Sequence, residues 1–220
     1  KQDWKQAVES FPLGDLSDEI LRLAGTRVLK TVQSSLQNIS LPHADLGADH
    51  VSKTPGTIEN KQLAKWYLDP RTGGTLNHSA RSHMVSDLHR YLYVSCFAKI
   101  EKRSPYMDEI PERLKPDHNN RDSGDFRVRF RVQTPKGPGH TVTSHISKDG
   151  HDNIHPDPRQ CRSFTVREAA RLQTFPDNYY FCGGRTDQYI QVGNAVPPLL
   201  ANKIAHIVKN LLKQAFRHLG

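Results

Sequence analysis

Two adjacent prolines close to the carboxy terminus limit what this part of the chain can become. The stretch "QVGNAVPPLL" places Pro197 and Pro198 directly after the turn dipeptide Gly193-Asn194. Proline lacks a backbone N–H and clashes with the preceding helical turn, so no helix can continue through this point. Because the first turn of a helix tolerates proline well, the sequence predicts a rigid turn followed by a new helix over 198–218.

The predicted last helix carries a wide apolar stripe. Basic residues gather towards its end, where they interact favourably with the helix dipole, and Gly220 follows as a stop signal. Such a stripe implies a surface against which the helix packs. Its members recur near the helical period: Leu200, Ile204, Ile207, Val208, Leu211 and Ala215.

The composition describes a basic chain. Its 220 residues suffice for one or two domains with a real core. Lysine and arginine number 31 against 23 acidic residues, a formal charge of +8, which fits a nucleic-acid partner as well as an ordinary basic surface. No apolar run is long enough to span a membrane, and the first residues carry no signal-peptide core. Three widely separated cysteines fit a reducing compartment better than a disulfide framework, so a cytoplasmic protein is expected.

Two amphipathic helices are predicted in the first half of the chain. The first covers 15–38, with Gly25 as a point where it can break in two. The segments 40–78 and 103–125 are rich in turn-forming residues and are expected to be irregular, apart from a short stretch around "LAKWYL". The second helix covers 80–101 and is expected to bury Met84, Leu88, Tyr91, Phe97 and Ile100.

An alternating segment, "RVRFRVQ" at 127–133, predicts a strand. Its valines and phenylalanine would face a core, and its three arginines would share the opposite face. Their spacing of roughly 6.5–7 Å on such a strand is close to that of successive phosphates, which favours phosphate contact over solvated side chains. The expected contacts are Arg127, Arg129 and Arg131.

A second short strand, "TVTSHIS" at 141–147, is predicted after the Pro/Gly loop "TPKGPGH". Thr141 and Thr143 would share one of its faces. A tight loop between two short strands can approach DNA closely, but it is also a common way to build an ordinary hairpin. Periodicity leaves these alternatives open.

A short helix is predicted to begin after Thr165, because Thr165-x-x-Glu168 is a capping-box signature. The helix is expected to end at Phe175-Pro176. Arg167 and Arg171 stand four residues apart, so they should project from one face.

The histidines invite a metal site, but their spacing does not support one. His145, His151 and His155 lie in a segment rich in Asp, Asn and Pro, without a known zinc-ligand spacing. A metal-dependent nuclease built on them and on "DHNN" at 117–120 lacks a nuclease signature for the same reason. No metal ligand is therefore assigned.

The stretches "RSFTVREAARLQTFPD" and "QYIQVGNAVPPLLANKIA" together resemble the last two sequence blocks of the DNA cytosine-5 methyltransferases. The blocks stand in the family's order and at a suitable spacing. The resemblance covers about residues 140–210 and includes "HTVTSHISKDG", which is similar to the end of the family's target-recognition region.

The resemblance implies an α+β fold. In the family, a large doubly wound α/β domain binds S-adenosylmethionine, and a small domain of short strands and helices reads double-stranded DNA while the target cytosine is flipped out. Residues 1–160 would be the target-recognition region, and 161–220 would supply the motif helix and a segment that completes the methyltransferase domain. The last helix would pack on that domain, most of which is absent from this chain.

The same resemblance assigns candidate site residues. The block around "QVGNAVPP" would help to close the cofactor pocket through Gly193, Asn194, Ala195 and Val196. Arg167, Glu168 and Arg171 match the block that organises the base of the recognition domain, with phosphate contact for the two arginines. Thr141 matches a threonine placed near the backbone of the flipped nucleotide. With the two threonines of one strand face and the three arginines of "RVRFRVQ", the expected DNA contacts are Arg127, Arg129, Arg131, Thr141, Thr143, Arg167 and Arg171.

The chain also departs from the family pattern. The family's nucleophile is the cysteine of a Pro-Cys pair, whereas Cys96, Cys161 and Cys182 follow serine, glutamine and phenylalanine. The early blocks that carry the cofactor's adenosine and the catalytic glutamate are absent as well. No catalytic residue is therefore assigned, and the three thiols are expected to be buried or incidental.

Two functions remain open on the sequence alone. In the first, the chain is the DNA-recognition and pocket-closing portion of a methyltransferase. It would then be inactive alone and would work with an amino-terminal catalytic part, on the same polypeptide or on a separate subunit. In the second, it is a stand-alone DNA-binding or regulatory module without catalysis. Neither the DNA sequence recognised nor membership of a restriction–modification pair follows from the residues.

Overall fold

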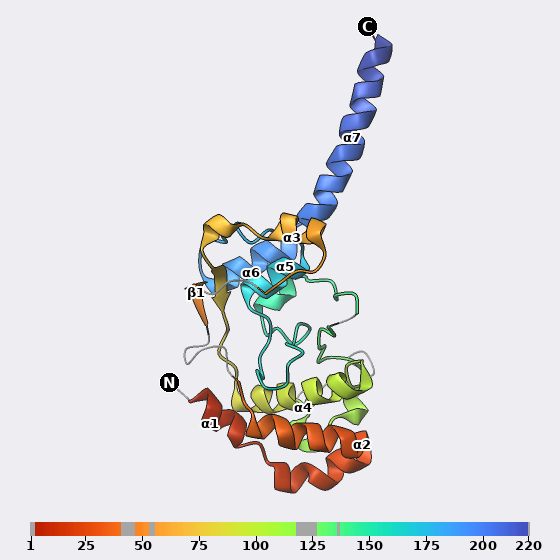
Figure 1. Ribbon diagram of the computed structural model, residues 1–220. Coiled ribbons are helices and arrows are strands. Elements are labelled where there is room, and N and C mark those ends of the chain that lie inside the picture. The colour runs from red at the N-terminus through yellow and green to blue at the C-terminus, as the bar shows by residue number, and fades with distance from the viewer. Residues whose placement is uncertain (1–2, 41–46, 53–55, 118–126, 136, 220) are drawn as a thin grey trace. The chain divides into compact units, whose positions relative to one another are not determined.

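The chain forms two compact units that interleave along the sequence. The computed structural model describes residues 3–40, 47–52, 56–117, 127–135 and 137–219 (Figure 1). Unit 1 consists of residues 1–48, 79–141 and 148–165, and unit 2 consists of residues 49–78, 142–147 and 166–220. Each unit has a hydrophobic core of its own. The expected division at residue 160 separates a recognition region from a segment that completes the methyltransferase domain. The compact units do not test that functional division, so it stays a prediction.

Unit 1 is helical. Its α-helices are α1 (Trp4–Glu9), α2 (Leu13–Gln37) and α4 (Val85–Glu101), and η2 (Met107–Glu109) and η3 (Glu112–Leu114) are short 3-10 helices. Both α1 and α2 pack against α4. Every residue from Tyr91 to Ala98 of α4 is buried, as expected for a helix covered on all sides.

The two helices predicted in this unit are confirmed, but the second begins at Val85 rather than at residue 80, and one of its expected core residues is exposed. Leu88, Tyr91 and Phe97 lie in the core, and Ile100 packs at its edge. Met84, however, is 67% exposed, because it is the N-cap residue and stands before the first turn of α4.

Gly25 bends α2, as its sequence predicts. Its backbone has φ 80° and ψ 172°, which lies outside the helical region and divides the helix at this point. Residues with a side chain rarely adopt this conformation.

Unit 2 contains a two-stranded sheet and the carboxy-terminal helices. Strands β1 (Gly47–Val51) and β2 (Thr75–Ser79) pair, and α3 (Lys61–Tyr67) and η1 (Pro70–Thr72) lie between them in sequence. The remaining elements are η4 (Ser144–Ser147), α5 (Val166–Leu172), α6 (Arg185–Asn194) and α7 (Pro198–Leu219). Helices with one small sheet are compatible with the expected α+β class. The core residues are Val142, Ile146, Val166, Ala169, Ala170, Phe175, Phe181, Tyr189 and Val192.

Both strands predicted at 127–133 and 141–147 are wrong. Phe130 and Val132 are buried as the alternation requires, but Val132 makes only an isolated bridge to Ile154, so no continuous ladder forms. Alternation determines which side chains are buried, whereas a strand also needs a partner along its length. In the second segment the buried residues are Val142 and Ile146, four apart, and the chain forms the 3-10 turn η4 instead.

The carboxy-terminal helices agree better with the sequence. Helix α5 begins directly after Thr165, as predicted, but it ends at Leu172 rather than at Phe175. The cause is Thr174, which adopts φ 63°, and the Phe175 amide, which donates to the Ala170 carbonyl.

Helix α6 was not predicted, and it corrects the interpretation of "GNAVPP". Gly193 and Asn194 are its last residues rather than a turn. The chain leaves the helical conformation at Ala195, and α7 begins at Pro198 as predicted.

The last helix exposes its apolar stripe. Every residue from Leu200 to Arg217 is exposed, including Ile207 at 61% and Phe216 at 69%. Within the described ranges, no helix combines the length and apolar character needed to cross a membrane.

The backbone at Gly25 can be tested by substitution. Gly25→Ala should lower the free energy of unfolding by roughly 1–3 kcal/mol, because alanine is strained at this backbone conformation. Urea denaturation followed by circular dichroism would measure the change.

Gly14→Ala is the matched control. Gly14 lies in the same helix without a positive φ, and no atom lies within 4 Å of an added Cβ. Alanine there should leave the stability unchanged or raise it. Equal effects of the two substitutions would contradict the strain at Gly25.

Candidate functional site

Arg167 lies in the interior of unit 2, which corrects its prediction as a residue on an exposed helix face. It is 1% exposed. Its Nε donates to the Leu76 carbonyl at 2.9 Å and its Nη1 to the Pro176 carbonyl at 3.1 Å, and its Nη2 donates to the Tyr179 carbonyl. A buried guanidinium with its donors directed at backbone carbonyls of its own unit cannot reach a phosphate unless the unit opens.

The surroundings of Arg167 explain why it is buried. Asn77 accepts from the Phe181 amide at 3.0 Å and donates to the Phe181 carbonyl at 3.1 Å, which ties β2 to the segment after α5. The guanidinium lies over the Phe181 ring, 5.7 Å from its centroid. Burial lowers the pKa of Arg167 to about 10, so the side chain keeps its charge at neutral pH.

Arg171 is partly accessible, and its charge is paired. Its Nε and Nη2 donate to the two carboxylate oxygens of Asp177 at 2.8 and 2.6 Å. Donation to the Asp177 carboxylate raises the pKa of Arg171 above its usual value. Tyr67 of α3 donates to the Arg171 carbonyl at 2.9 Å, so this pair is also tied to α3. Arg167 and Arg171 therefore do not share an exposed face.

In unit 1, the basic segment 127–131 lies beside an acidic turn that is distant in sequence and contains Asp149 and Asp152. Arg131 is exposed, and its Nε lies 3.5 Å from an Asp152 carboxylate oxygen. The Arg129 guanidinium lies 3.9 Å from Asp149. Arg127 is exposed and stacks over the Tyr106 ring at 4.2 Å. The three arginines thus remain near the surface, but carboxylates offset part of their charge, and their contact with DNA stays a prediction.

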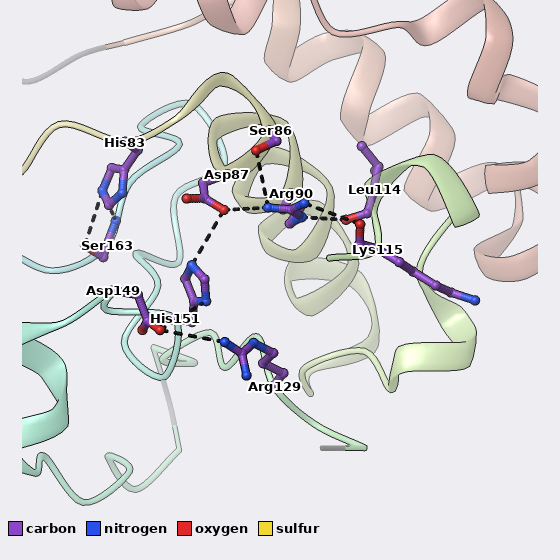
Figure 2. A network of polar contacts seen from close by, with 10 residues as sticks. All are labelled: His83, Ser86, Asp87, Arg90, Leu114, Lys115, Arg129, Asp149, His151 and Ser163. Atoms are coloured by element: carbon purple, nitrogen blue, oxygen red, sulfur yellow. Dashed lines mark hydrogen bonds and ion pairs between the residues drawn. The ribbon is translucent and has the colours of Figure 1, made fainter. Parts of the chain in front are cut away.

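A buried polar network fixes the acidic turn to α4. Figure 2 shows Asp87 between Arg90 and His151, with Asp149 on the other side of the imidazole. Arg90 Nη1 lies 2.6 Å from Asp87, and the two His151 ring nitrogens lie 3.6 Å from Asp87 and from Asp149. Burial alone would raise the pKa of Asp87, but its contacts with His151 and Arg90 outweigh burial and hold the pKa below its usual value.

His83 lies in the same unit and is held in its neutral form. Its Nε2 accepts a hydrogen bond from the Ser163 amide at 3.2 Å (Figure 2). Burial, reinforced by the charge of Arg81, lowers the pKa of His83 to about 3.

The candidate cofactor segment lies at the end of α6. Asn194 is exposed, Val196 is 63% exposed, and Ala195 is half-buried. At Gly193 the backbone itself makes a close contact, since an added Cβ would lie 2.3 Å from the Ser144 amide nitrogen. The absence of a side chain therefore permits internal packing against residues 143–144. Thr143, expected to contact DNA, is exposed beside this contact, and Thr141 is exposed in unit 1.

The cysteines and histidines complete the comparison with the sequence. Burial raises the pKa of Cys96 to about 12 and that of Cys161 well above its usual range, so both remain thiols at neutral pH, while Cys182 is exposed. Among the described residues, no group of three His, Cys, Asp or Glu side chains is arranged to hold a metal ion. Most of "DHNN" lies outside the described residues.

Similarity to known proteins decides the family. The family model described as C-5 cytosine-specific DNA methylase matches residues 38–210. The chain belongs to this family. It is 52% identical over 139 residues to the type II methyltransferase M.Bpa9945I of Bacillus paralicheniformis, a match that covers 63% of this chain and 30% of that protein.

Other relatives agree. M.DdeI of Desulfomicrobium norvegicum is 34% identical over 189 residues, or 80% of this chain and 43% of the relative. M1.HphI of Haemophilus parahaemolyticus is 40% identical over 133 residues, or 60% of this chain and 31% of the relative. Each match thus spans less than half of the relative's own length. All three relatives carry the name type II methyltransferase.

Some structurally important residues of this methylase-family chain gave no signal in the sequence. Asn77 adopts φ 52°, a conformation that asparagine tolerates, but only its contacts reveal its role. Gln173 is 8% exposed and donates to three backbone carbonyls. The sequence shows Gln173 inside "ARLQTF", but it does not reveal the contacts of this side chain with Val142 and Ala195.

Replacement of Arg167 tests its structural role. Arg167→Met should lower the free energy of unfolding of unit 2 by roughly 3 kcal/mol, because it removes the donor of three backbone carbonyls that are shielded in part from water. Trp66 of α3 donates to the Thr174 carbonyl at 2.8 Å and reports on this unit. Its fluorescence during urea denaturation, in a Trp4→Phe background, would measure the change.

Arg131→Met is the control for the loss of an arginine. Its exposed ion pair should be worth less than about 1 kcal/mol. If Arg167→Met were no more destabilising than Arg131→Met, the interior role of Arg167 would be refuted.

His83 predicts a pH dependence of stability. Its pKa is about 3 in the folded chain, against 6.5 for an unperturbed histidine, so below pH 6.5 the unfolded chain binds a proton that the folded chain refuses. Acid therefore removes stability as the pH falls from 6.5 towards 3. Glutamine cannot titrate in this way, so the wild-type advantage over His83→Gln should shrink by up to about 1.4 kcal/mol per pH unit in this window.

Urea denaturation between pH 7 and pH 4 would measure the difference between the two proteins. The exposed His145→Gln replacement serves as the control. A difference between wild type and His83→Gln that does not vary with pH would show that His83 is not held neutral.

Proposed function

We propose that this chain is the DNA-recognition and cofactor-pocket-closing portion of an S-adenosylmethionine-dependent DNA cytosine-5 methyltransferase. The observation that carries the proposal is the family match over residues 38–210, in a chain that spans less than half of its relatives. A catalytic part, on the same polypeptide or on a separate subunit, supplies the nucleophilic cysteine. Without that part the chain transfers no methyl group.

The exposed face of α7 supports a partner outside this chain. Leu200, Ile204 and Leu211 are each about half-exposed or more. An apolar stripe of this width is costly in water and is expected to be covered in the working protein. We propose that the doubly wound catalytic part covers it.

The cofactor proposal rests on residues 193–196. Members of the C-5 cytosine methylase family use S-adenosylmethionine as methyl donor. Asn194 and Val196 are exposed at the end of α6, where they can form one wall of a pocket whose other walls belong to the catalytic part. The role of this chain's residues is to close the pocket by backbone contact.

Double-stranded DNA is the proposed partner of the exposed basic and hydroxyl side chains. Arg127, Arg129 and Arg131 supply phosphate contacts. Thr141 lies near the backbone of the flipped nucleotide, and Thr143 also contacts DNA. Arg171 can contribute only if its pair with Asp177 opens, and Arg167 contributes by holding unit 2 together rather than by contact.

Methyl transfer tests the proposed function. In a chimera, this chain replaces the matching segment of the Bacillus paralicheniformis relative, and transfer of a labelled methyl group from S-adenosylmethionine to duplex DNA is measured. The chimera should methylate DNA and the isolated chain should not. Methylation by the isolated chain would refute the proposal that its catalytic site is incomplete. Salt-dependent DNA binding by a folded but inactive chimera would favour the stand-alone module.

The salt dependence of DNA binding tests the basic segment. In the chimera, Arg131→Ala should weaken binding similarly for all duplex sequences and lower the slope of log affinity against log salt by about 1. Asp152→Asn should strengthen binding, since it removes the carboxylate 3.5 Å from Arg131.

Lys209→Ala, an exposed change on α7, is the control for the loss of a positive charge. Fluorescence anisotropy over a range of salt concentrations would give the slopes. A slope that changes equally for Arg131→Ala and Lys209→Ala would remove the basic segment from the DNA interface.

A further inference from the structure

We propose that Gln173 is a positioning residue that couples cofactor binding to DNA binding. It joins the segment 142–144, assigned above to DNA, to the segment 192–196, assigned to the cofactor. The inference rests on the proposed function of these two segments and adds a physical connection between them. All of the contacts involved lie within unit 2.

The side-chain amide of Gln173 makes the connection. Its Nε2 donates to the Val142 carbonyl at 3.3 Å, to the Val192 carbonyl at 3.2 Å and to the Ala195 carbonyl at 3.4 Å. An amide nitrogen has only two N–H groups, so the three carbonyls share them. Val192 and Ala195 stand at the end of α6, where the carbonyls of the last turn run short of helical partners. The Val192 carbonyl also accepts from the Ala195 amide at 3.4 Å. Gln173 thus caps α6 and holds residue 142 with the same group.

Gly193 allows the two segments to pack in direct backbone contact. An added Cβ would lie 2.3 Å from the Ser144 amide nitrogen and 2.4 Å from the Thr143 carbonyl carbon. The helix backbone therefore rests directly on the backbone of residues 143–144. Val142, Ile146 and Val192 continue the contact in the shared core. A displacement of the last turn of α6 must move Thr143 as well.

Thr174 holds the other end of the cofactor segment. Its Oγ1 accepts from the Leu199 amide at 3.0 Å, and its own carbonyl accepts from Trp66 Nε1 at 2.8 Å. The residues between Ala195 and Leu199 are therefore fixed at both ends by neighbouring residues, Gln173 and Thr174. This arrangement presents Val196 outward on a rigid support.

A ligand that orders residues 193–196 should consequently also order residues 142–144. Coupling between two sites is reciprocal, and typical values change an affinity by roughly 5–150-fold. In the complete enzyme we expect a cofactor analogue to tighten DNA binding on the order of 10-fold. Loss of the Gln173 donors should bring this factor close to 1.

The experiment uses the methylating chimera, S-adenosylhomocysteine as the unreactive cofactor analogue and a cytosine-containing duplex selected by the wild-type enzyme. DNA affinity is measured with and without the analogue for wild type, Gln173→Met and Gln191→Met. Methionine matches glutamine in length but has no donor. Gln191 is an exposed residue of α6 that donates to the Cys182 carbonyl at 2.9 Å, and it is the matched control.

The ratio of the two affinities separates positioning from a merely structural role. The ratio should fall in Gln173→Met and persist in Gln191→Met, whereas simple destabilisation would weaken both affinities and leave the ratio unchanged. An unchanged ratio in Gln173→Met would overturn the inference.

Hydrogen exchange on the wild-type chimera keeps the test decisive if Gln173→Met does not fold. The analogue should protect the amides of residues 142–146 together with those of 192–196. Protection confined to 192–196 would overturn the inference. If the wild-type chimera bound both ligands without any coupling, the inference would be overturned and the proposed function would stand. A wild-type enzyme that binds neither ligand would overturn the proposed function, and the inference with it.

Discussion

Unit 2 depends on one buried cation. The guanidinium of Arg167 donates to backbone carbonyls of β2 and of the segment that follows α5, which stand far apart in the sequence. A buried charge is tolerated only when its donors are satisfied, and here backbone oxygens rather than a carboxylate satisfy them. The same contacts hold the segment that carries Phe175 and Phe181, which share a core with Tyr189 and Val192 of α6. The 193–196 segment therefore depends on Arg167 for part of its support.

The two sequence blocks of the C-5 cytosine methylase family have largely internal tasks in this chain. Arg167, Gln173 and Gly193 hold backbone segments together, and Asp177 pairs with Arg171. The exposed candidate groups lie at the ends of these segments and in the basic segment of unit 1. We propose that this division of labour lets one rigid support carry both a cofactor wall and a nucleotide contact, while the catalytic chemistry comes from a part outside this chain.

Periodicity predicted α2, α4 and α7, because an apolar stripe depends only on residues near in sequence, and the capping-box signature predicted the start of α5. The bend at Gly25 and the start of α7 at Pro198 follow from local backbone rules for the same reason. The two strands failed because a ladder needs a partner that alternation cannot supply. The exposure of Arg167 and the charge around Arg131 were misjudged since their partners, Leu76 and Asp152, come from distant sequence. The candidate residues of the cofactor segment came from family resemblance alone.

The guanidinium Nε–H of Arg167 offers the most direct measurement of this account. In a nitrogen-15 NMR spectrum of the chain, the Arg167 Nε–H, assigned by its loss in Arg167→Lys, should exchange slowly with water. It should also keep its frequency when duplex DNA is added, while the Arg131 signal shifts. A rapidly exchanging Arg167 signal, or one that shifts on DNA binding as the Arg131 signal does, would contradict the claim that this residue supports the site from within.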